Sequence, residues 1–540
     1  MPRRGTAIGF CLLAIGAVAV VYATVGTQGV EAQGEGDQAT PQVDYGILSL
    51  LPAFVALTLA YLTRQVLMAL FLGVVCGSIV VFSQSQEYAD LNFLAKFLIP
   101  SLGTQNYAQI LLVYLWCLGG ILGIWSKTGG ARHFAERIGT RIAQSPRGAK
   151  LFAWMVGCIF HQGGTVSTVL AGTTVKPVSD RHRISHEELS YIVDSTASPV
   201  ATIIPFNAWP LVVGGFVAGA TLEGHVLIGD DEGAAWFFGS IPFNFYGMFA
   251  VLSTLLFSLG LLPWTGKRMR LAIERARSTG KLDADDAEPM LDASMMEANS
   301  EEDYPTGLED FFLPLGLLVG IAIVPWLLGQ GLFIKEAFLV CTLSAMVLAR
   351  FKGMRLRTIV EGFIDGCKSM TLGAIILGLA ITLGDVAREL NTADFLIDAI
   401  GEKIPTWLLP LALTATCMII SFSVGSSFGT YAVIFPIAIP LAFKIAIDAQ
   451  ALGAEPVSEL AERFPDQWET ILFYVHICFG AVLGGAVFGD QCSPISDTTI
   501  LSSMFTGCDL MDHVKTQLPL ALAAAGLGAV CSTLLVIMSS

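Results

Sequence analysis

Charged side chains are scarce in this sequence. Asp, Glu, Lys and Arg make up 14% of the 540 residues, whereas apolar residues make up 54%. This composition excludes an ordinary soluble enzyme and is typical of a polytopic membrane protein. The formal net charge is −15, and the acidic residues gather in loops, which argues against nucleic acid as a partner. We therefore expect a multi-pass protein of a cell membrane, specifically a bacterial inner membrane.

Motifs of catalytic and cofactor sites are also missing. The 11 cysteines are scattered without a CxxC pair or a His/Cys cluster of zinc-site spacing. They are expected to be small apolar core residues, and neither a disulfide framework nor a metal centre. No Walker loop, nucleophile triad or redox-cofactor motif is present. The sequence therefore predicts a protein that is neither an enzyme nor an ATP-driven pump, and that carries no cofactor.

Apolar runs long enough to cross a bilayer form two similar sets, one in each half of the chain. They lie near residues 46–63, 66–82, 108–125 and 241–263, and then near 311–328, 337–349, 371–386 and 518–538. Another apolar run, at residues 5–25, is long for a signal peptide and favours an uncleaved span. With the interrupted regions that lie inside each set, we predict about 11 spans of an all-α membrane protein.

The distribution of basic residues indicates how the two halves are oriented. Six Lys or Arg residues lie in 127–150 and five in 267–277, whereas 29–44 contains none. Basic loops stay in the cytoplasm, so the first half starts outside and the second starts inside. This is an inverted repeat. The predicted domains are an N-terminal span or signal-like segment with an external loop (1–44), a first transmembrane repeat (45–264), a cytoplasmic acidic linker (265–310) and a second, inverted repeat (311–540).

Each half also contains a Gly/Ser/Thr-rich stretch inside apolar sequence. The first stretch runs from His161 to Thr168, and the second from Gly425 to Thr430. Irregular polar backbone survives in hydrocarbon only where it is buried in protein or lines a cavity. We therefore predict two re-entrant hairpins, at 151–175 from the cytoplasmic side and at 408–443 from the external side.

A broken helix is expected after each hairpin. Residues 189–220 contain the pair Ser198-Pro199 and residues 470–505 contain Ser493-Pro494, each a few residues after an Asp. Proline removes a backbone donor and leaves carbonyl groups for an ion or substrate. Paired interruptions in corresponding positions of two halves are the sequence sign of a secondary transporter.

The interrupted regions contain the oxygen ligands that a hard cation such as sodium prefers. The candidate site residues are Gly164, Thr165, Ser167, Thr168, Asp194, Thr196, Ser198 and Asn207 in the first half, and Ser426, Ser427, Thr430, Asp490, Ser493, Ser496, Asp497 and Thr498 in the second. Direct sodium ligands are expected among Asp194, Ser198, Asp490, Ser493 and Asp497. For any single hydroxyl, the alternative is a helix cap or a packing contact.

Carboxylates at membrane depth are functional candidates by default, because burying a charge there is costly. Each of the three Asp residues near the breaks either binds a cation or titrates, and so couples protons to it. For Asp194 the alternative is an interfacial helix cap. His161 and Asn207 are weaker candidates for substrate contacts, with a helix-packing hydrogen bond as the alternative.

The string from Gly489 to Thr499 resembles the Gly-Asp…Ser-Pro…Ser-Asp-Thr-Thr signature of the NhaC family of sodium/proton antiporters. The Gly163-Gly164-Thr165 stretch and the Asp194…Ser198-Pro199 break look like the first repeat of that family. The resemblance implies inverted repeats with paired hairpins, an elevator-type carrier and a homodimer. It supports Asp490, Ser493, Asp497 and Thr498 in the second half, and Asp194, Thr196 and Ser198 in the first.

The leading hypothesis is sodium/proton antiport, by alternating access at a midplane Asp/Ser/Thr site where sodium and protons compete. The alternative is sodium-coupled transport of a small carboxylate or amino acid, whose carboxylate would lie at the hairpin tips. The near absence of Lys and Arg at the breaks favours a cation over a multiply charged anion. A channel or sensor built on a transporter scaffold is disfavoured, because two occluding hairpins argue against an open pore.

Overall fold

The computed structural model describes residues 45–63, 65–85, 91–130, 133, 137, 143–161, 164–204, 207–222, 225–229, 232–289, 304–328, 333–392, 395, 404–453, 455–494 and 496–539. The predicted N-terminal span or signal-like segment lies outside these residues. The described chain is helical apart from one short antiparallel pair, β1 (Thr221–Leu222) and β2 (His225–Val226).

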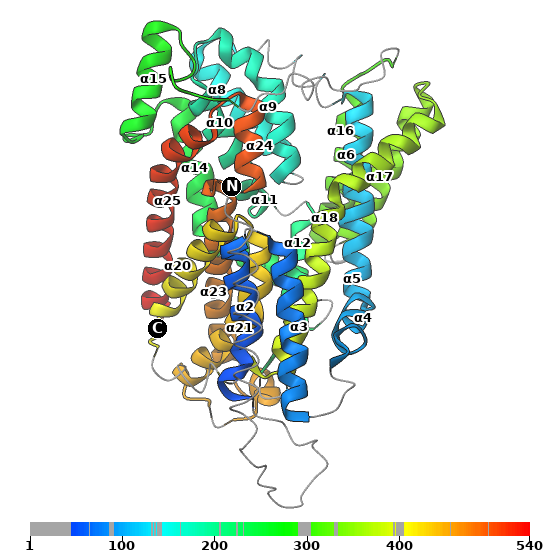
Figure 1. The fold of residues 1–540 in the computed structure, drawn as a ribbon, viewed down its shortest axis with the longest axis vertical. Coiled ribbons are helices and arrows are strands. Elements are labelled where there is room, and N and C mark those ends of the chain that lie inside the picture. Colours follow the sequence, from blue (N-terminus) through cyan, green and yellow to red (C-terminus); the bar gives the residue numbers. More distant parts are fainter. Residues whose placement is uncertain are drawn as a thin grey trace, which may run out of the picture.

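The helices of the first half, up to the linker, are η1 (Gly46–Leu50), α2 (Leu51–Thr63), α3 (Val66–Ser85), η3 (Leu94–Leu98), α4 (Ile99–Leu102), α5 (Gln105–Ile110), η4 (Leu111–Leu118), α6 (Gly119–Thr128), α8 (Pro146–Ile159), α9 (Gly164–Arg181), α10 (His186–Ser195), α11 (Ser198–Ala201), α12 (Trp209–Val217), α13 (Gly233–Ser240), η5 (Ile241–Phe243), α14 (Phe245–Leu259) and α15 (Lys267–Thr279). The remaining helices are α16 (Glu309–Leu327), α17 (Ile334–Phe351), α18 (Leu356–Glu389), α20 (Leu408–Val424), α21 (Ser427–Ala449), η8 (Val457–Glu459), α22 (Leu460–Arg463), α23 (Pro465–Cys492), α24 (Asp497–Thr506) and α25 (Leu510–Ser539) (Figure 1).

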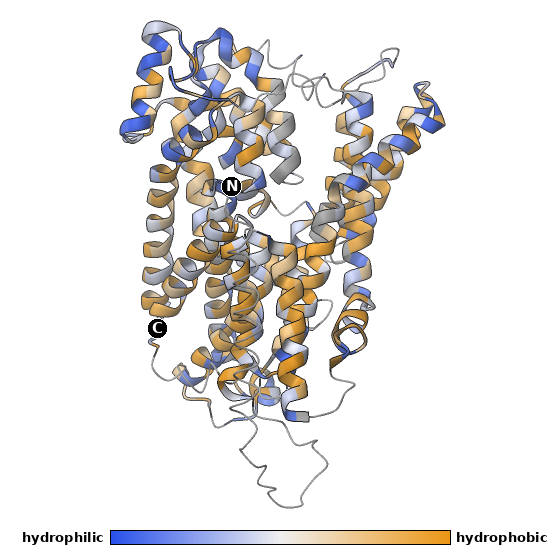
Figure 2. Ribbon diagram, viewed as in Figure 1, coloured by the Kyte–Doolittle hydropathy of each residue, from blue (hydrophilic) through white to orange (hydrophobic). Residues whose placement is uncertain are grey.

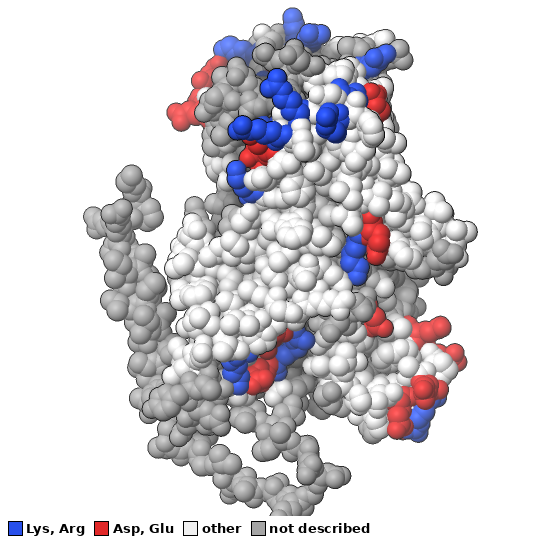
Figure 3. All heavy atoms as spheres, turned by 90° about the vertical axis from the view of Figure 1, so that its right-hand side faces the viewer, with Lys and Arg blue, Asp and Glu red and all other residues white. Residues whose placement is uncertain are grey.

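Apolar residues dominate the middle and lower part of the helical bundle, and polar residues gather around α15 and the neighbouring ends of α8 and α10 (Figure 2). On the face shown in Figure 3, a broad zone almost free of charged side chains separates charged groups near the two ends. Among the described residues, five helices are long and apolar enough to cross a membrane, or six if α13 to α14, bent by 53°, count as one span. The chain is therefore a multi-pass membrane protein, and the total number of spans, about 11, stays a prediction.

The second predicted hairpin is formed by α20 and α21, which both pack against α23. Helix α20 runs parallel to α23, because Tyr474 Oη donates to Thr406 O at 2.8 Å while Ser421 Oγ donates to Gly485 O at 3.2 Å. Helix α21 runs antiparallel to α23: the Tyr431 hydroxyl donates to Leu483 O, and the rings of Phe443 and Trp468 meet at 5.9 Å. Both outer ends of the hairpin therefore lie beside the start of α23, and its tip at Gly425–Ser426 lies near the end of that helix.

The first predicted hairpin, α8 and α9, packs on α10 in the same way. Helix α8 is parallel to α10, since Lys150 pairs with Glu188 at 3.1 Å and Gly157 lies against Thr196. Helix α9 is antiparallel to α10, since Lys176 near its end contacts His186 at the start of α10. The open end of this hairpin lies near α15 at the top of Figure 1, whereas α21 ends at the bottom. The two hairpins therefore enter the bundle from opposite ends.

Both broken helices are present, and the first break lies slightly earlier than predicted. Helix α10 ends at Ser195 and α11 begins at Ser198, so the break centres on Thr196 and Ala197. We expected it at Ser198-Pro199. Proline is favoured in the first turn of a helix, where its missing N–H leaves no bond unmade, and Pro199 lies in the first turn of α11. The second break separates Cys492 at the end of α23 from Asp497 at the start of α24, as predicted.

Helices α6 and α18 approach each other closely through glycines. Gly119 and Gly123 on α6 face Gly362 and Gly366 on α18, so near that a Cβ at any of these four positions would overlap the opposite helix. Small residues four apart allow such backbone contact between membrane helices. Together with the α16–α17 hairpin, whose two ends are joined by Lys352 pairing with Glu309 at 2.7 Å, α6 and α18 form a separate group of helices at the right of Figure 1.

Replacing Gly366 with Leu is expected to destabilise this contact by about 3 kcal/mol, because overpacking forces the two backbones apart. The measurement is the apparent melting temperature of the purified protein in detergent. The matched control is Gly320→Leu on α16, where a Cβ would meet nothing within 4 Å. Equal melting temperatures for the two variants would contradict the α6–α18 packing described above.

Candidate ion-binding site

Asp490, near the end of α23, is held by the tip of the second hairpin. Its Oδ1 accepts a hydrogen bond from the Ser427 backbone N–H at 2.7 Å, and its Oδ2 accepts one from the Ser427 hydroxyl. The Ser198 side chain also lies close to this carboxyl. Asp490 is 6% exposed. A buried carboxylate, two serine hydroxyls and the first turn of α21 therefore meet at one point between the two halves.

Asp194, at the end of α10, is bound by two side chains of α25. Its Oδ2 lies 3.0 Å from His513 Nε2 and accepts a hydrogen bond from Gln517 Nε2 at 2.9 Å. The Asp194 and His513 side chains are both 0% exposed. Within the described part of the chain, His513 Nδ1 and Gln517 Oε1 have no hydrogen-bond partner. Asp194 thus belongs to a buried polar network and is not an interfacial helix cap.

Gln491 lies between the two carboxylates and joins the two helix breaks. Its Nε2 donates to Ser195 Oγ at 2.7 Å, and its Oε1 accepts a hydrogen bond from the Tyr246 hydroxyl. The backbone carbonyl of Gln491 accepts a hydrogen bond from Gln517, the same residue that donates to Asp194. Gln517 therefore links Asp194 to Gln491, the residue that follows Asp490 in the chain.

Asp497, the first residue of α24, differs from the other two carboxylates because its side chain is exposed. It occupies a helix N-terminus, where the helix dipole stabilises a negative group. Asp497 interacts electrostatically with both Asp490 and Asp194. It is therefore the carboxylate of the three that water or an incoming cation reaches in this conformation.

The other second-half candidates surround Asp490. The Thr498 hydroxyl donates to the Asp490 carbonyl at 2.6 Å and lies 3.0 Å from Ser496 Oγ. Ser493 is fully buried at the break. Ser426 caps α21 and accepts a bond from Gly429 N, and the Thr430 hydroxyl donates to the Ser426 carbonyl. Ser426 and Thr430 thus satisfy the hairpin backbone, and the hydroxyls of Ser493, Ser496 and Thr498 lie close to the Asp490 end of α23.

The first-half candidates are more divided. Ser167 and Thr168 are buried in α9, and the Ser167 hydroxyl donates to Gly157 O across the hairpin. The Thr196 hydroxyl bonds to the α10 backbone. The Asn207 amide donates to Ala201 O and Ile204 O and accepts from Trp209 N, which fits its packing alternative. The side chains of Gly164 and Thr165 are outside the described part of the structure.

In the described ranges, no group of three or more His, Cys, Asp or Glu side chains is arranged to hold a metal ion. A transported sodium ion would therefore draw on one carboxylate together with hydroxyls and carbonyl oxygens, which agrees with the ligands that hard cations prefer. The residues around Asp490 offer this combination. Direct sodium binding stays a prediction for Asp194, Ser198, Ser493 and Asp497.

Four residues of this network were not found from the sequence: Tyr246, Gln491, His513 and Gln517. Gln491 lies inside the Gly489–Thr499 string, and its position next to Asp490 was a usable signal. His513 and Gln517 are one helical turn apart just before the last apolar run, a spacing that places them on one face of a helix. Nothing in the sequence pairs that face with Asp194, so only the packing of α25 against α10 shows the contact.

A second cluster of charged side chains lies at the end of the bundle where α15 packs. His186 Nδ1 is 2.7 Å from Asp283, in the segment after α15, and His186 Nε2 is near Asp180 and Lys176. Arg275 on α15 donates to both carboxylate oxygens of Glu187. The beginning of the predicted acidic linker is therefore a helix docked onto α10.

The pKa of His186 is expected to control part of this docking. Burial lowers this pKa, but the hydrogen bonds to Asp180 and Asp283 outweigh both burial and the repulsion from Lys176, so the pKa is raised. The ring charge thus stabilises the fold fully below the ordinary pKa of about 6.5, and this stability is lost as pH rises through the raised pKa. The difference in melting temperature between wild type and His186→Gln should shrink between pH 6 and pH 9. A difference that does not change with pH would contradict the assignment.

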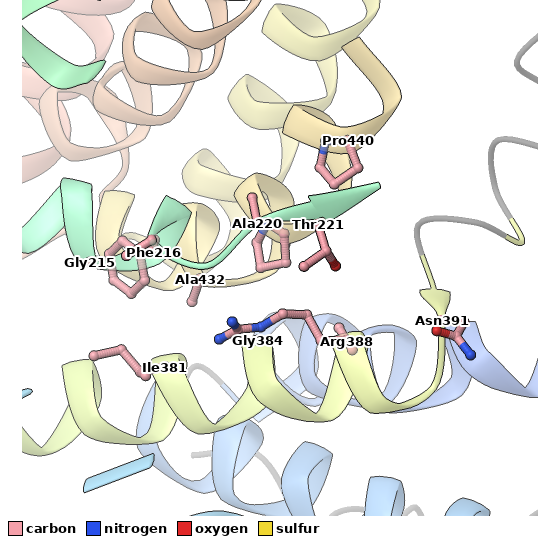
Figure 4. A pocket seen from close by; sticks show the side chains of 13 residues that line it. Gly215, Phe216, Ala220, Thr221, Ile381, Gly384, Arg388, Asn391, Ala432 and Pro440 are labelled. Atoms are coloured by element: carbon pink, nitrogen blue, oxygen red, sulfur yellow. The ribbon is translucent and has the colours of Figure 1, made fainter. Parts of the chain in front are cut away.

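A cavity separates α12 and α21 from α18. It is lined largely by small or apolar residues, among them Gly215, Ala432 and Gly384, and by the guanidinium of Arg388, which donates to Gly219 O at 3.1 Å. Figure 4 shows Ile381, Gly384 and Arg388 on one helix, facing Gly215, Phe216 and Ala220 across the cavity. None of the lining residues belongs to the Asp490 or Asp194 networks. The cavity lies where α18 packs against α12 and α21.

Comparison with known proteins identifies relatives of this chain. The sequence model of the Na+/H+ antiporter family matches residues 218–455 and 467–536. A Haemophilus influenzae protein, described as uncharacterized, is 28% identical over 89% of both chains. The Na+/H+ antiporter NhaC of Alkalihalophilus pseudofirmus is 30% identical over 33% of this chain and 32% of its own. The malate-2H+/Na+-lactate antiporter of Bacillus subtilis is 43% identical over 10% of this chain and 12% of its own.

The matched part includes the second hairpin, both arms of the second broken helix and α25, and thus Ser427, Asp490, Asp497 and His513. Asp194 and the rest of the first-half site lie before it. The prediction of an NhaC-type antiporter made from the Gly489–Thr499 string is confirmed, as is the prediction that the protein is a secondary transporter and not an enzyme. Because the family model matches more than half of its residues, this chain belongs to the Na+/H+ antiporter family.

Proposed function

We propose that sodium/proton antiport takes place at Asp490, where sodium and a proton bind alternately. The observation that carries this proposal is the burial of the Asp490 carboxylate against the tip of the second hairpin, with both of its oxygens bonded to Ser427. Among the described residues, the Asp490 carboxylate is hydrogen-bonded by the neutral Ser427, and a buried carboxylate with neutral partners is stable either protonated or beside a cation. Competition between the two ligands for one site is enough to couple their movements.

The sodium ligands in this account are the Asp490 carboxylate and the hydroxyls of Ser198 and Ser427. Ser493 lies at the second break. Asp497, exposed at the start of α24, would attract the cation and guide it toward Asp490. Asp194 has a structural role in this account and holds the first break in place, since its Oδ2 is already bonded to His513 and Gln517.

Alternating access of an elevator type is supported by the way the helices are grouped. The two hairpins pack on α10 and α23, and α10, α23 and the second hairpin are joined through Gln491, Ser195 and Ser427. Helices α6 and α18 form a tight pair of their own through glycines. The cavity shown in Figure 4 lies between these groups. We propose that the hairpin-bearing group slides along α18 as a unit, within an inverted-repeat fold.

The assembly and location proposed for the protein follow from its surface and relatives. Leu343, Val347 and Phe351 on α17 are exposed, and such a face suits lipid or a second copy of the chain. A homodimer in a bacterial inner membrane is therefore our expectation for this carrier.

Sodium-coupled transport of a small carboxylate or amino acid is the second candidate. It is favoured by one observation: a Bacillus subtilis relative is named as a malate-2H+/Na+-lactate antiporter. In this case the substrate carboxylate would bind at the N-termini of the hairpin helices α9 and α21, where the helix dipole attracts an anion. The short match to that relative makes this the weaker candidate.

Proteoliposomes with a trapped pH dye distinguish the two functions. On addition of external sodium without any organic solute, the antiporter account predicts alkalinisation of the lumen, and no response to potassium at the same ionic strength. The measurement is repeated with a panel of labelled carboxylates and amino acids. A silent dye, together with sodium-driven accumulation of one labelled solute, would replace the antiporter account with the second candidate.

A further inference from the structure

Gln491 is the one side chain in the described structure that hydrogen-bonds both the first helix break, at Ser195, and α14, at Tyr246, while its own backbone lies at the second break. It is 1% exposed. The amide supplies one acceptor and one donor to these contacts: Oε1 accepts from the Tyr246 hydroxyl, and Nε2 donates to Ser195 Oγ. This arrangement exceeds what a single packing contact requires.

The surroundings of Gln491 connect both carboxylates. Asp490 is the preceding residue, and Asp194 precedes Ser195. Gln517 links the two helix breaks a second time, because its Nε2 donates both to the Gln491 carbonyl and to Asp194 Oδ2. The Ser198 side chain, three residues after Ser195, lies close to the Asp490 carboxyl. A shift of the first break relative to the second would therefore move Ser198 away from Asp490.

We propose that Gln491 is a positioning residue that locks the two helix breaks into one ion site, so that the first-half Ser198 and the second-half Asp490 bind the same sodium ion. The inference rests on the proposed function at Asp490. It goes beyond that function because it states that one amide, that of Gln491, sets the position of the first break relative to the second. The two pseudo-symmetric breaks then form one site and not two independent ones.

The sodium dissociation constant of the purified protein tests this inference through a double-mutant cycle. Gln491→Met keeps the length of the side chain and removes its hydrogen bonds, and Ser195→Ala removes the partner hydroxyl. Each variant should raise the sodium dissociation constant about tenfold, because each leaves a buried polar group without its partner. The double variant should also show about a tenfold increase, since both substitutions break the same link.

The maximal rate of exchange should stay within about threefold of wild type in all three variants. This is expected when a substitution weakens sodium binding equally in the ground state and in the transition state. Ser258→Ala on α14 is the control, because the Ser258 hydroxyl is buried and bonds only its own helix at Thr254 O; it should leave the constant unchanged. A hundredfold increase in the double variant, or unchanged sodium affinity in Gln491→Met, would overturn the inference.

Failure of the inference and failure of the proposed function give different results. A wild-type protein that binds sodium but moves no protons would refute the antiport at Asp490, while the binding cycle would still decide the role of Gln491. A wild type that binds no sodium would overturn both. If Gln491→Met does not fold, the cycle is run between Ser195→Ala and Tyr246→Phe. The hydroxyls that these substitutions remove are the two hydrogen-bond partners of the Gln491 amide. Additive effects on the sodium dissociation constant would again refute the inference.

Discussion

Asp490→Asn should lower sodium-driven proton exchange by about 100-fold or more, equivalent to about 2.7 kcal/mol of barrier. Asparagine has the size of aspartate and its carbonyl still accepts the bond from Ser427 N–H, so the hairpin tip keeps its place. The amide carries no negative charge for sodium and does not exchange a proton at physiological pH. The measurement is the initial rate of the dye response in proteoliposomes at saturating sodium.

The control for this prediction lies on the same helix. Asp466 is exposed in the first turn of α23, and Asp466→Asn should exchange at the wild-type rate. If Asp490→Asn keeps more than a tenth of wild-type activity while folded, the ion site is elsewhere, and the exposed Asp497 becomes the leading candidate.

Asp194→Ala is expected to cause the largest loss of stability, about 3–5 kcal/mol, because it removes the buried carboxylate that His513 and Gln517 both contact. At roughly 2–4 °C per kcal/mol this lowers the melting temperature by about 10 °C. Combining Asp194→Leu with His513→Leu should recover most of the loss, since two apolar side chains replace the whole pair.

The melting temperature in detergent measures this effect, and Asp512→Ala serves as the neighbouring control. Asp512 lies beside His513 on α25 but is partly exposed, so its removal should change stability by less than about 1 kcal/mol. Equal melting temperatures for Asp194→Ala and Asp512→Ala would show that the contact between α10 and α25 does not hold the first break.

The hairpins and breaks were predictable from the sequence because their chemistry is local. Gly425 has a positive φ of 72° and ends α20, a conformation that favours glycine, and Ser426 caps the next helix. Such residues stand out inside an apolar run whatever surrounds them. The predicted start of the second hairpin at Leu408 therefore agrees with the start of α20.

The partners of each carboxylate were not predictable, because they are set by tertiary packing. Asp490 and Asp497 are seven residues apart in one motif, yet one is buried and the other exposed, since a break reorients the helix between them. The pairing of Asp194 with His513 joins residues 319 positions apart. The glycine contact of α6 with α18 was partly readable from the four-residue spacing of Gly119 and Gly123, but not the identity of the opposite helix.

Proton release on sodium binding tests the central claim most directly. Purified protein in weakly buffered detergent solution, near the pH at which exchange is half-maximal, is mixed with sodium chloride while a pH dye is followed. If sodium displaces the proton from Asp490, the solution acidifies in wild type, stays unchanged with potassium chloride, and stays unchanged in Asp490→Asn. Sodium binding without proton release in wild type would contradict competition at a single carboxylate, and with it the proposed coupling.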